Sequence, residues 1–223
     1  MFKSLAVYQF IDGQKRIVIK ESFSNNDLKV IDRCYSSLAE YERYKTLFQM
    51  VLDNYLDLTK YLEKQENDEK HSEDSIKKIG FHANRLTINY LSSAKLFIEH
   101  TEKKLKSKYG NNSQEFKDWK SATKKEFDSS FSYRFLYHLR NYTQHYGFPI
   151  GSISRNSKIK NIMLFFVKDS LISNNYDWHR DVIRDLKEAP DKIPIFRVIN
   201  EYNGCMARLY QAALKANCTT TSY

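Results

Sequence analysis

Apolar positions in the first 65 residues follow two different periodicities. β-Branched and aromatic residues flank Asp12-Gly13 and predict a small β-hairpin in residues 1–22, because glycine tolerates the positive φ of a tight turn. Residues 24–26 (Ser-Asn-Asn) then offer a helix cap. Apolar residues follow at near-helical spacing to about residue 65, at Leu28, Ile31, Tyr35, Leu38, Tyr41, Phe48, Leu52, Tyr55, Leu58 and Leu62. This pattern predicts one long amphipathic helix.

A second long helix is expected after residues 66–74, which are charged and predict an exposed loop. Its apolar face comprises Ile79, Ala83, Leu86, Tyr90, Phe97 and Leu105. Gly110 can supply the left-handed conformation that often ends a helix, so this helix should end near residue 109. A shorter helix around residues 116–127 and a helical segment over 130–146 complete this part of the chain.

The apolar pattern changes after Pro149. Residues 158–172 (KIKNIMLFFVKDSLI) fit a strand or a helix, and the N-terminal hairpin favours the strand. Residues 177–190 predict a short helix ending at Pro190, and a last helix is expected from about Ile193 to Ala216. With only 6 Gly and 3 Pro, long uninterrupted elements are favoured, so the sequence predicts a mainly α protein that forms a single domain over residues 1–223.

The formal net charge of +9 favours a polyanionic partner, since neutralised phosphates release their condensed counterions. The densest basic region is Lys103–Lys125, although a solvated helix face explains it equally well. Cys34, Cys205 and Cys218 lie far apart and do not form the close pairs of a zinc or redox site. The sequence lacks a signal peptide and an apolar run long enough to cross a bilayer. We therefore expect a soluble, cytoplasmic protein without a metal or cofactor.

Residues 131–151 (FSYRFLYHLRNYTQHYGFPIG) hold the candidate chemistry. Wound as a helix, they place one apolar face at Phe131, Phe135, Leu139, Tyr142 and Tyr146. A polar stripe lies beside it at Arg134, His138, Asn141 and His145. Gly147 and Pro149 end this helix just after His145. The last two turns of the helix therefore carry Arg140, Asn141 and His145.

The order Arg140, Asn141, three further residues and His145, close to a helix end, resembles the motif of ribonucleases in the HEPN superfamily. The resemblance implies a helical bundle over residues 27–148, with residues 1–22 and 150–218 as a hairpin and a helical C-terminal extension outside it. It also implies metal-independent cleavage of RNA by Arg140 and His145 with Asn141 in support, in microbial defence or a toxin–antitoxin system. A regulatory antitoxin or defence-system partner would then control the enzyme. Some HEPN toxins have a modifiable tyrosine two residues after the histidine, where this chain has Gly147.

The chemistry of these residue types agrees with that activity. Attack by the adjacent 2′-hydroxyl needs a base, an acid for the leaving 5′-oxygen, and positive charge on the phosphate. Histidine serves either proton role near neutral pH, and arginine presents a charged planar fork to phosphate oxygens. On an ideal helix, residues five apart point ~140° apart, so one helix does not hold both against one phosphate. We therefore expect a homodimer with a composite site, as in HEPN ribonucleases.

Other interpretations of these residues remain open. His145 can complement the helix dipole, and Arg140 can cap carbonyls or pair with an acid. Further candidate RNA contacts are Arg134, His138, Lys120, Lys124 and Lys125, although His138 fits an interior position equally well. Residues that could support the site from the second long helix are His82, Arg85 and Asn89. The alternatives to an enzyme are a non-catalytic HEPN-like module that binds nucleotides, RNA or protein, and a simple RNA-binding protein that uses Lys103–Lys125.

Overall fold

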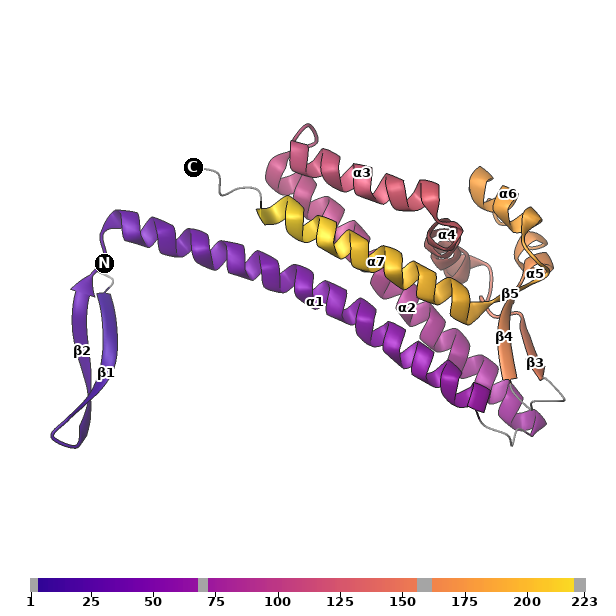
Figure 1. Cartoon of the computed structure of the whole chain (residues 1–223), viewed down its shortest axis with the longest axis horizontal. Coiled ribbons are helices and arrows are strands. Elements are labelled where there is room, and N and C mark those ends of the chain that lie inside the picture. Colours follow the sequence, from indigo (N-terminus) through magenta and orange to yellow (C-terminus); the bar gives the residue numbers. More distant parts are fainter. Residues whose placement is uncertain (1–3, 68–71, 156–161, 219–223) are drawn as a thin grey trace. The chain divides into compact units, whose positions relative to one another are not determined.

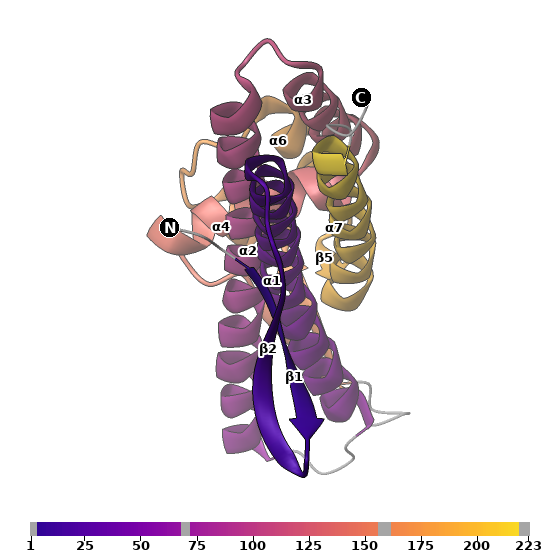
Figure 2. The same ribbon diagram turned by 90° about the vertical axis from the view of Figure 1, so that its left-hand side faces the viewer.

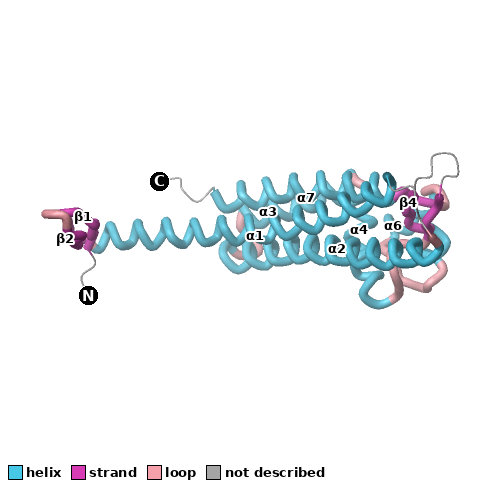
Figure 3. Tube along the Cα trace, turned by 90° about the horizontal axis from the view of Figure 1, so that it is seen from below, coloured by secondary structure: helices cyan, strands magenta, loops and turns pink. Residues whose placement is uncertain are grey.

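The computed structural model describes residues 4–67, 72–155 and 162–218 and has seven helices within them (Figure 1). The chain forms two compact units, Met1–Arg43 and Tyr44–Tyr223, and the boundary between them falls inside helix α1 (Asn25–Asn67). The two units are therefore described separately. The mainly α prediction is confirmed, and Figure 3 shows helix as the dominant element.

The N-terminal unit contains the predicted hairpin and the first part of α1. Strands β1 (Ser4–Ile11) and β2 (Gln14–Ser22) pair antiparallel, and the turn residues Asp12 and Gly13 have φ values of 51° and 76°. The side chain of Asp27 accepts a hydrogen bond from the Ser24 amide (2.9 Å), and the Asp27 amide donates to Ser24 Oγ (3.2 Å). This reciprocal pair caps the first turn of α1, because it satisfies amides that lack helical partners.

The apolar stripe predicted for the long helix is buried only in the second unit. The predicted long helix is confirmed by α1, but Tyr35, Leu38 and Tyr41 of its apolar face are 71%, 57% and 45% exposed. From Tyr44 onwards the stripe does enter a core: Phe48 stacks on Tyr210 at a ring separation of 4.2 Å.

The second unit is a bundle around a large aromatic core. Its other long helices are α2 (Glu73–Tyr109), α3 (Gln114–Ser129) and α7 (Ile195–Cys218), which run alongside one another (Figures 1 and 2). Helix α4 (Phe131–His145) packs against all three of them. The largest fully buried side chains include Trp119, Tyr90, Phe97, Phe135 and Tyr202. This core fixes the position of α4, the helix with the candidate motif.

Helix α4 begins and ends close to the predicted residues. Ser130 caps it by accepting from the Tyr133 amide at 3.1 Å, and Phe135, Leu139 and Tyr142 are buried as predicted. Tyr146 was expected on the same buried face, yet it is 48% exposed. The helix ends at His145 and Tyr146 has non-helical dihedrals (φ −121°, ψ −38°), so its side chain leaves the helical track.

The C-terminal part is less purely helical than expected. Strands β3 (Ser152–Arg155), β4 (Ile162–Val167) and β5 (Lys192–Pro194) form an antiparallel sheet in that order, near one end of the bundle (Figure 3). The predicted strand over 158–172 is confirmed for β4, whereas residues 168–172 form helix α5 (Lys168–Ile172), and 158–161 lie outside the described residues. The expected short helix is α6 (Arg180–Glu188). None of the helices in the described part combines the length and apolar composition needed to span a bilayer.

Candidate active site

Arg140 lies on a groove formed by three helices of the second unit. The groove has a volume of about 360 Å³, and its lining residues are Met50 and Asn54 from α1, Asn89, Ser92, Ser93, Leu96 and Glu99 from α2, and Arg140 from α4. One guanidinium nitrogen, Nη1, donates to the side-chain oxygen of Gln144 one turn later. The buried Nε has no hydrogen-bond partner among the described residues. The groove therefore combines one cation, Arg140, and one carboxylate, Glu99, with amide and hydroxyl groups that can bind a polar ligand.

Asn141 is held by a lysine that the sequence analysis did not identify. Lys95 of α2 donates from Nζ to Asn141 Oδ1 at 2.6 Å, and its ammonium lies 3.7 Å from Glu99 Oε1 and 5.0 Å from the centre of the Tyr137 ring. Lys95 is only 8% exposed. Burial lowers its pKa and nearby Arg140 adds to that effect, whereas Glu99 opposes both. A buried lysine beside the motif fixes the Asn141 amide.

The signal that could have identified Lys95 is its place within an apolar stretch. Leu91, Ala94, Phe97 and Ile98 around it are all buried, so a lysine on this face of α2 must have a specific partner. The sequence alone does not name that partner, because Asn141 lies 46 residues further along the chain.

His145 is exposed on the last turn of α4 and does not line the groove. It has no hydrogen-bond or ion-pair partner in the described part of the chain. The structure therefore brings Arg140, Asn141 and Lys95 together within one chain, while His145 stands apart from them. That separation matches the difference in direction expected for residues five apart on a helix.

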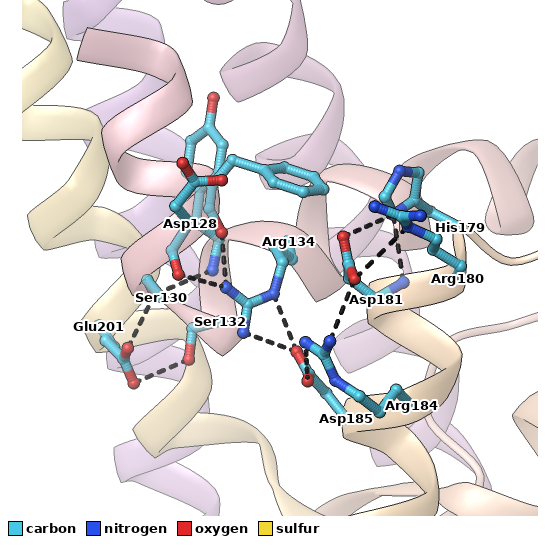
Figure 4. A network of polar contacts seen from close by, with 12 residues as sticks. Asp128, Ser130, Ser132, Arg134, His179, Arg180, Asp181, Arg184, Asp185 and Glu201 are labelled. Atoms are coloured by element: carbon cyan, nitrogen blue, oxygen red, sulfur yellow. Dashed lines mark hydrogen bonds and ion pairs between the residues drawn. The ribbon is translucent and has the colours of Figure 1, made fainter. Parts of the chain in front are cut away.

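Arg134 has a structural position rather than one suited to RNA. Its Nε and Nη2 donate to Asp185 Oδ2 of α6 at 2.8 and 2.6 Å, and both side chains are nearly buried (Figure 4). Its Nη1 donates to the carbonyls of Phe127 and Asp128, at the end of α3. The guanidinium thus joins α3, α4 and α6, and it is not free to bind a phosphate.

His138 is half-buried among aromatic rings. Its ring stacks on His179 at a centroid distance of 5.3 Å and lies against Phe127 and Tyr137. Burial lowers the pKa of His138 to about 4, and His179 and Lys95 add to this shift. The imidazole is therefore neutral near pH 7, which favours the interior interpretation over a charged contact with RNA.

The low pKa of His138 predicts that the free energy of unfolding decreases when the pH is lowered below about 6.5. Unfolding restores an ordinary pKa near 6.5, so the unfolded state binds the proton first and stability is lost as the pH falls from about 6.5 towards 4. Because His138 is only half-buried, solvent screening should hold this loss to roughly 1 kcal/mol between pH 7 and pH 5. Urea unfolding of the native protein and of His138→Gln checks it: the variant should lose less stability over that range. Equal losses in both proteins would contradict the assignment.

The lysines proposed as RNA contacts lie on α3. Lys120 pairs with Glu102 of α2 at 3.2 Å, and Lys124 pairs with Asp128 at 2.6 Å. Lys125 is exposed. Exposed ion pairs of this kind contribute little stability and exchange readily with other anions. These residues are separate from the groove that contains Arg140.

Only one of the three supporting residues expected on α2 reaches the groove. Asn89 lines it with Arg140, whereas His82 packs against the rings of Phe81 and Tyr61. Across the described ranges, no cluster of three or more histidine, cysteine or acidic side chains is arranged to bind a metal ion.

Comparison of the chain with protein-family models, curated proteins and solved structures finds no match. The residues of the site and their chemistry are therefore the basis for assigning a function.

Proposed function

We propose that this protein is a metal-independent endoribonuclease of the HEPN type that acts as a homodimer. The observation that carries the proposal is the arrangement at the end of α4: Arg140 borders a polar groove, Asn141 is fixed by Lys95, and His145 is exposed one turn further on. The Arg140 guanidinium is the cation of this groove, and a charged planar guanidinium suits a ligand with acceptor oxygens.

In the proposed reaction the 2′-oxygen of a ribose bonds to the adjacent phosphorus, and the bond to the 5′-oxygen breaks. A base takes the proton of the 2′-hydroxyl, and an acid gives a proton to the leaving 5′-oxygen. The products are a 2′,3′-cyclic phosphate and a 5′-hydroxyl. Arg140 would bind the phosphate oxygens and stabilise their charge in the transition state. Asn141, oriented by Lys95, would hold the phosphate or the imidazole.

A second copy of the chain would complete the site. One His145 cannot be base and acid in the same step, whereas two copies facing each other at the ends of α4 supply one of each. The exposure of His145 and its lack of a partner among the described residues agree with such a shared position. Action in microbial defence or a toxin–antitoxin system, under control of a regulatory partner, is part of this proposal through the resemblance alone.

The rival function is a module that binds RNA or nucleotides without cleaving them. The amide and hydroxyl groups of Asn54, Asn89, Ser92 and Ser93 favour it, because such groups suit recognition of sugars and base edges. A protein that binds only through the lysines of α3 is favoured less, since these lysines do not line the groove that contains Arg140.

Incubation of the native protein with single-stranded and structured RNA in the presence of EDTA separates these functions. We expect cleavage that persists in EDTA and leaves cyclic phosphate and 5′-hydroxyl ends, because no step uses a metal ion. Fragments with 5′-phosphate ends would contradict the mechanism. Saturable binding without cleavage would favour the non-catalytic module.

A further inference from the structure

The N-terminal unit has no core of its own. No described side chain from Ser4 to Arg43 is buried, although the segment is rich in large apolar residues. Ten of them are 38% to 77% exposed: Leu5, Tyr8, Phe10, Ile11, Ile17, Ile19, Val30, Tyr35, Leu38 and Tyr41. Scattered apolar residues are normal on a protein surface, but a contiguous apolar patch usually marks an interaction site.

The hairpin concentrates this apolar surface on one of its two faces. Tyr8 lies opposite Ile17 and Ala6 lies opposite Ile19, so these side chains share a face. Phe10 continues this face opposite Lys15, whose ammonium lies 4.1 Å from the centre of the Tyr8 ring. Tyr8, Phe10, Ile17 and Ile19 are 65%, 77%, 64% and 70% exposed. The other face carries Val7 opposite Val18, Gln9 opposite Arg16 and Ile11 opposite Gln14, and its two valines are partly buried. We call the set Tyr8, Phe10, Ile17 and Ile19 the apolar hairpin face.

An isolated two-stranded hairpin is marginally stable in water, and three strands or a packed face are needed for independent stability. This hairpin, with strands of eight and nine residues and one apolar face, therefore needs another molecule packed against that face to be stable. Their unpaired edges are also open to another strand.

The charge of the segment indicates what kind of molecule covers it. Residues 1–43 carry seven basic and six acidic side chains, whereas residues 44–223 carry 29 basic and 21 acidic ones. A nearly neutral, aromatic surface does not suit RNA, whose binding depends on clustered positive charge. It does suit association with an identical surface, because there is little like-charge repulsion and an apolar face complements itself across a two-fold axis.

The available area is also sufficient for a dimer. The four side chains of the apolar hairpin face offer roughly 400 Å² at about 100 Å² each, and the six other exposed apolar side chains of residues 4–43 bring the total to on the order of 1,000 Å². A stable interface buries about 800 Å² on each partner. A second copy of the chain must therefore contact the first part of α1 as well as the apolar hairpin face to bury an area of this size.

We propose that residues 4–43 form a dimerisation arm, in which the apolar hairpin face of one chain packs on the same face of a second copy. This inference does not depend on ribonuclease activity. It names a surface through which the proposed homodimer assembles, on a different unit of the chain from Arg140 and His145.

Sedimentation equilibrium of the whole protein tests the dimerisation arm by measuring the dissociation constant of the dimer. Two variants are compared, at adjacent residues that lie on opposite faces of β1. Phe10→Glu places a charge on the apolar hairpin face, and Gln9→Glu makes the same change in charge on the other face. We expect a dimeric native protein, an increase of roughly 100-fold in the dissociation constant for Phe10→Glu, and less than about threefold for Gln9→Glu. A monomeric native protein, or a Phe10→Glu dimer as tight as the native one, would overturn the proposal.

A second variant addresses the possibility that Phe10→Glu unfolds the hairpin itself. Ile17→Thr with Ile19→Thr keeps β-branched residues, which favour strands, but makes the face polar. It should also weaken the dimer by at least roughly tenfold, with an unchanged thermal transition of the helical bundle by circular dichroism. A native-like dissociation constant in this variant would exclude the apolar hairpin face. Failure of the native protein to cleave RNA would overturn only the proposed function, because sedimentation reads assembly without activity.

Discussion

The His145→Ala protein is expected to cleave RNA at least ~1,000-fold more slowly than the native protein, because the reaction loses both its base and its acid. Arg140→Ala should lower the rate by roughly 100- to 1,000-fold, since it removes the charge that stabilises the phosphate in the transition state. The measurement is the single-turnover rate constant at saturating protein, in EDTA. His145 is exposed and has no partner in the described structure, so its replacement should leave folding unchanged.

Lys125→Ala is the control for general loss of positive charge. Lys125 is exposed on α3, away from the groove, so its loss should weaken RNA binding at most modestly and leave the saturated rate unchanged. If Lys125→Ala slows the saturated reaction as much as Arg140→Ala, the site assignment is wrong. If His145→Ala cleaves at the native rate, His145 has no part in the mechanism.

Arg134→Leu is expected to lower the free energy of unfolding by about 3 kcal/mol. The substitution leaves the nearly buried Asp185 carboxylate without its shortest contact, and the remaining contact is with the more exposed Arg184. It also removes the donor that serves the carbonyls of Phe127 and Asp128. Urea unfolding at neutral pH measures the effect.

The partner variants make this prediction specific to the ion pair. Arg134→Leu with Asp185→Leu should cost clearly less than the sum of the single changes, because the double variant does not leave an unpaired buried charge. Lys124→Ala, which breaks an exposed pair with Asp128, should cost less than about 1 kcal/mol. Additive costs at Arg134 and Asp185 would show that the two side chains do not act as a pair.

The elements that the sequence predicted well are those specified by local signals. The Asp12-Gly13 turn, the cap at Ser24 and the end of α4 near Gly147 all depend on residues close to the element that they bound. The strands β3 and β5 were not predicted because they have four and three residues and exist only through pairing with β4. Strands this short carry too little periodicity to be recognised alone.

The candidate site divides in the same way. The sequence identified Arg140, Asn141 and His145, because their spacing near a helix end is itself the signal. It did not reveal that Lys95 donates a hydrogen bond to Asn141 or that Arg134 forms an ion pair with Asp185, since both contacts join residues about fifty positions apart. A polar stripe on a helix shows which residues share a side, but the packing of neighbouring helices decides which of them are free to bind a ligand.

The most direct test of the proposed composite site mixes native protein with His145→Ala at constant total concentration, after dissociation and reassembly to allow exchange of chains. The proposal needs a histidine from each copy, so activity should fall as the square of the native fraction. An equal mixture should then retain about one quarter of the activity of the native protein alone. A linear fall, with about one half retained, would mean that each chain has a complete site and would contradict the shared one.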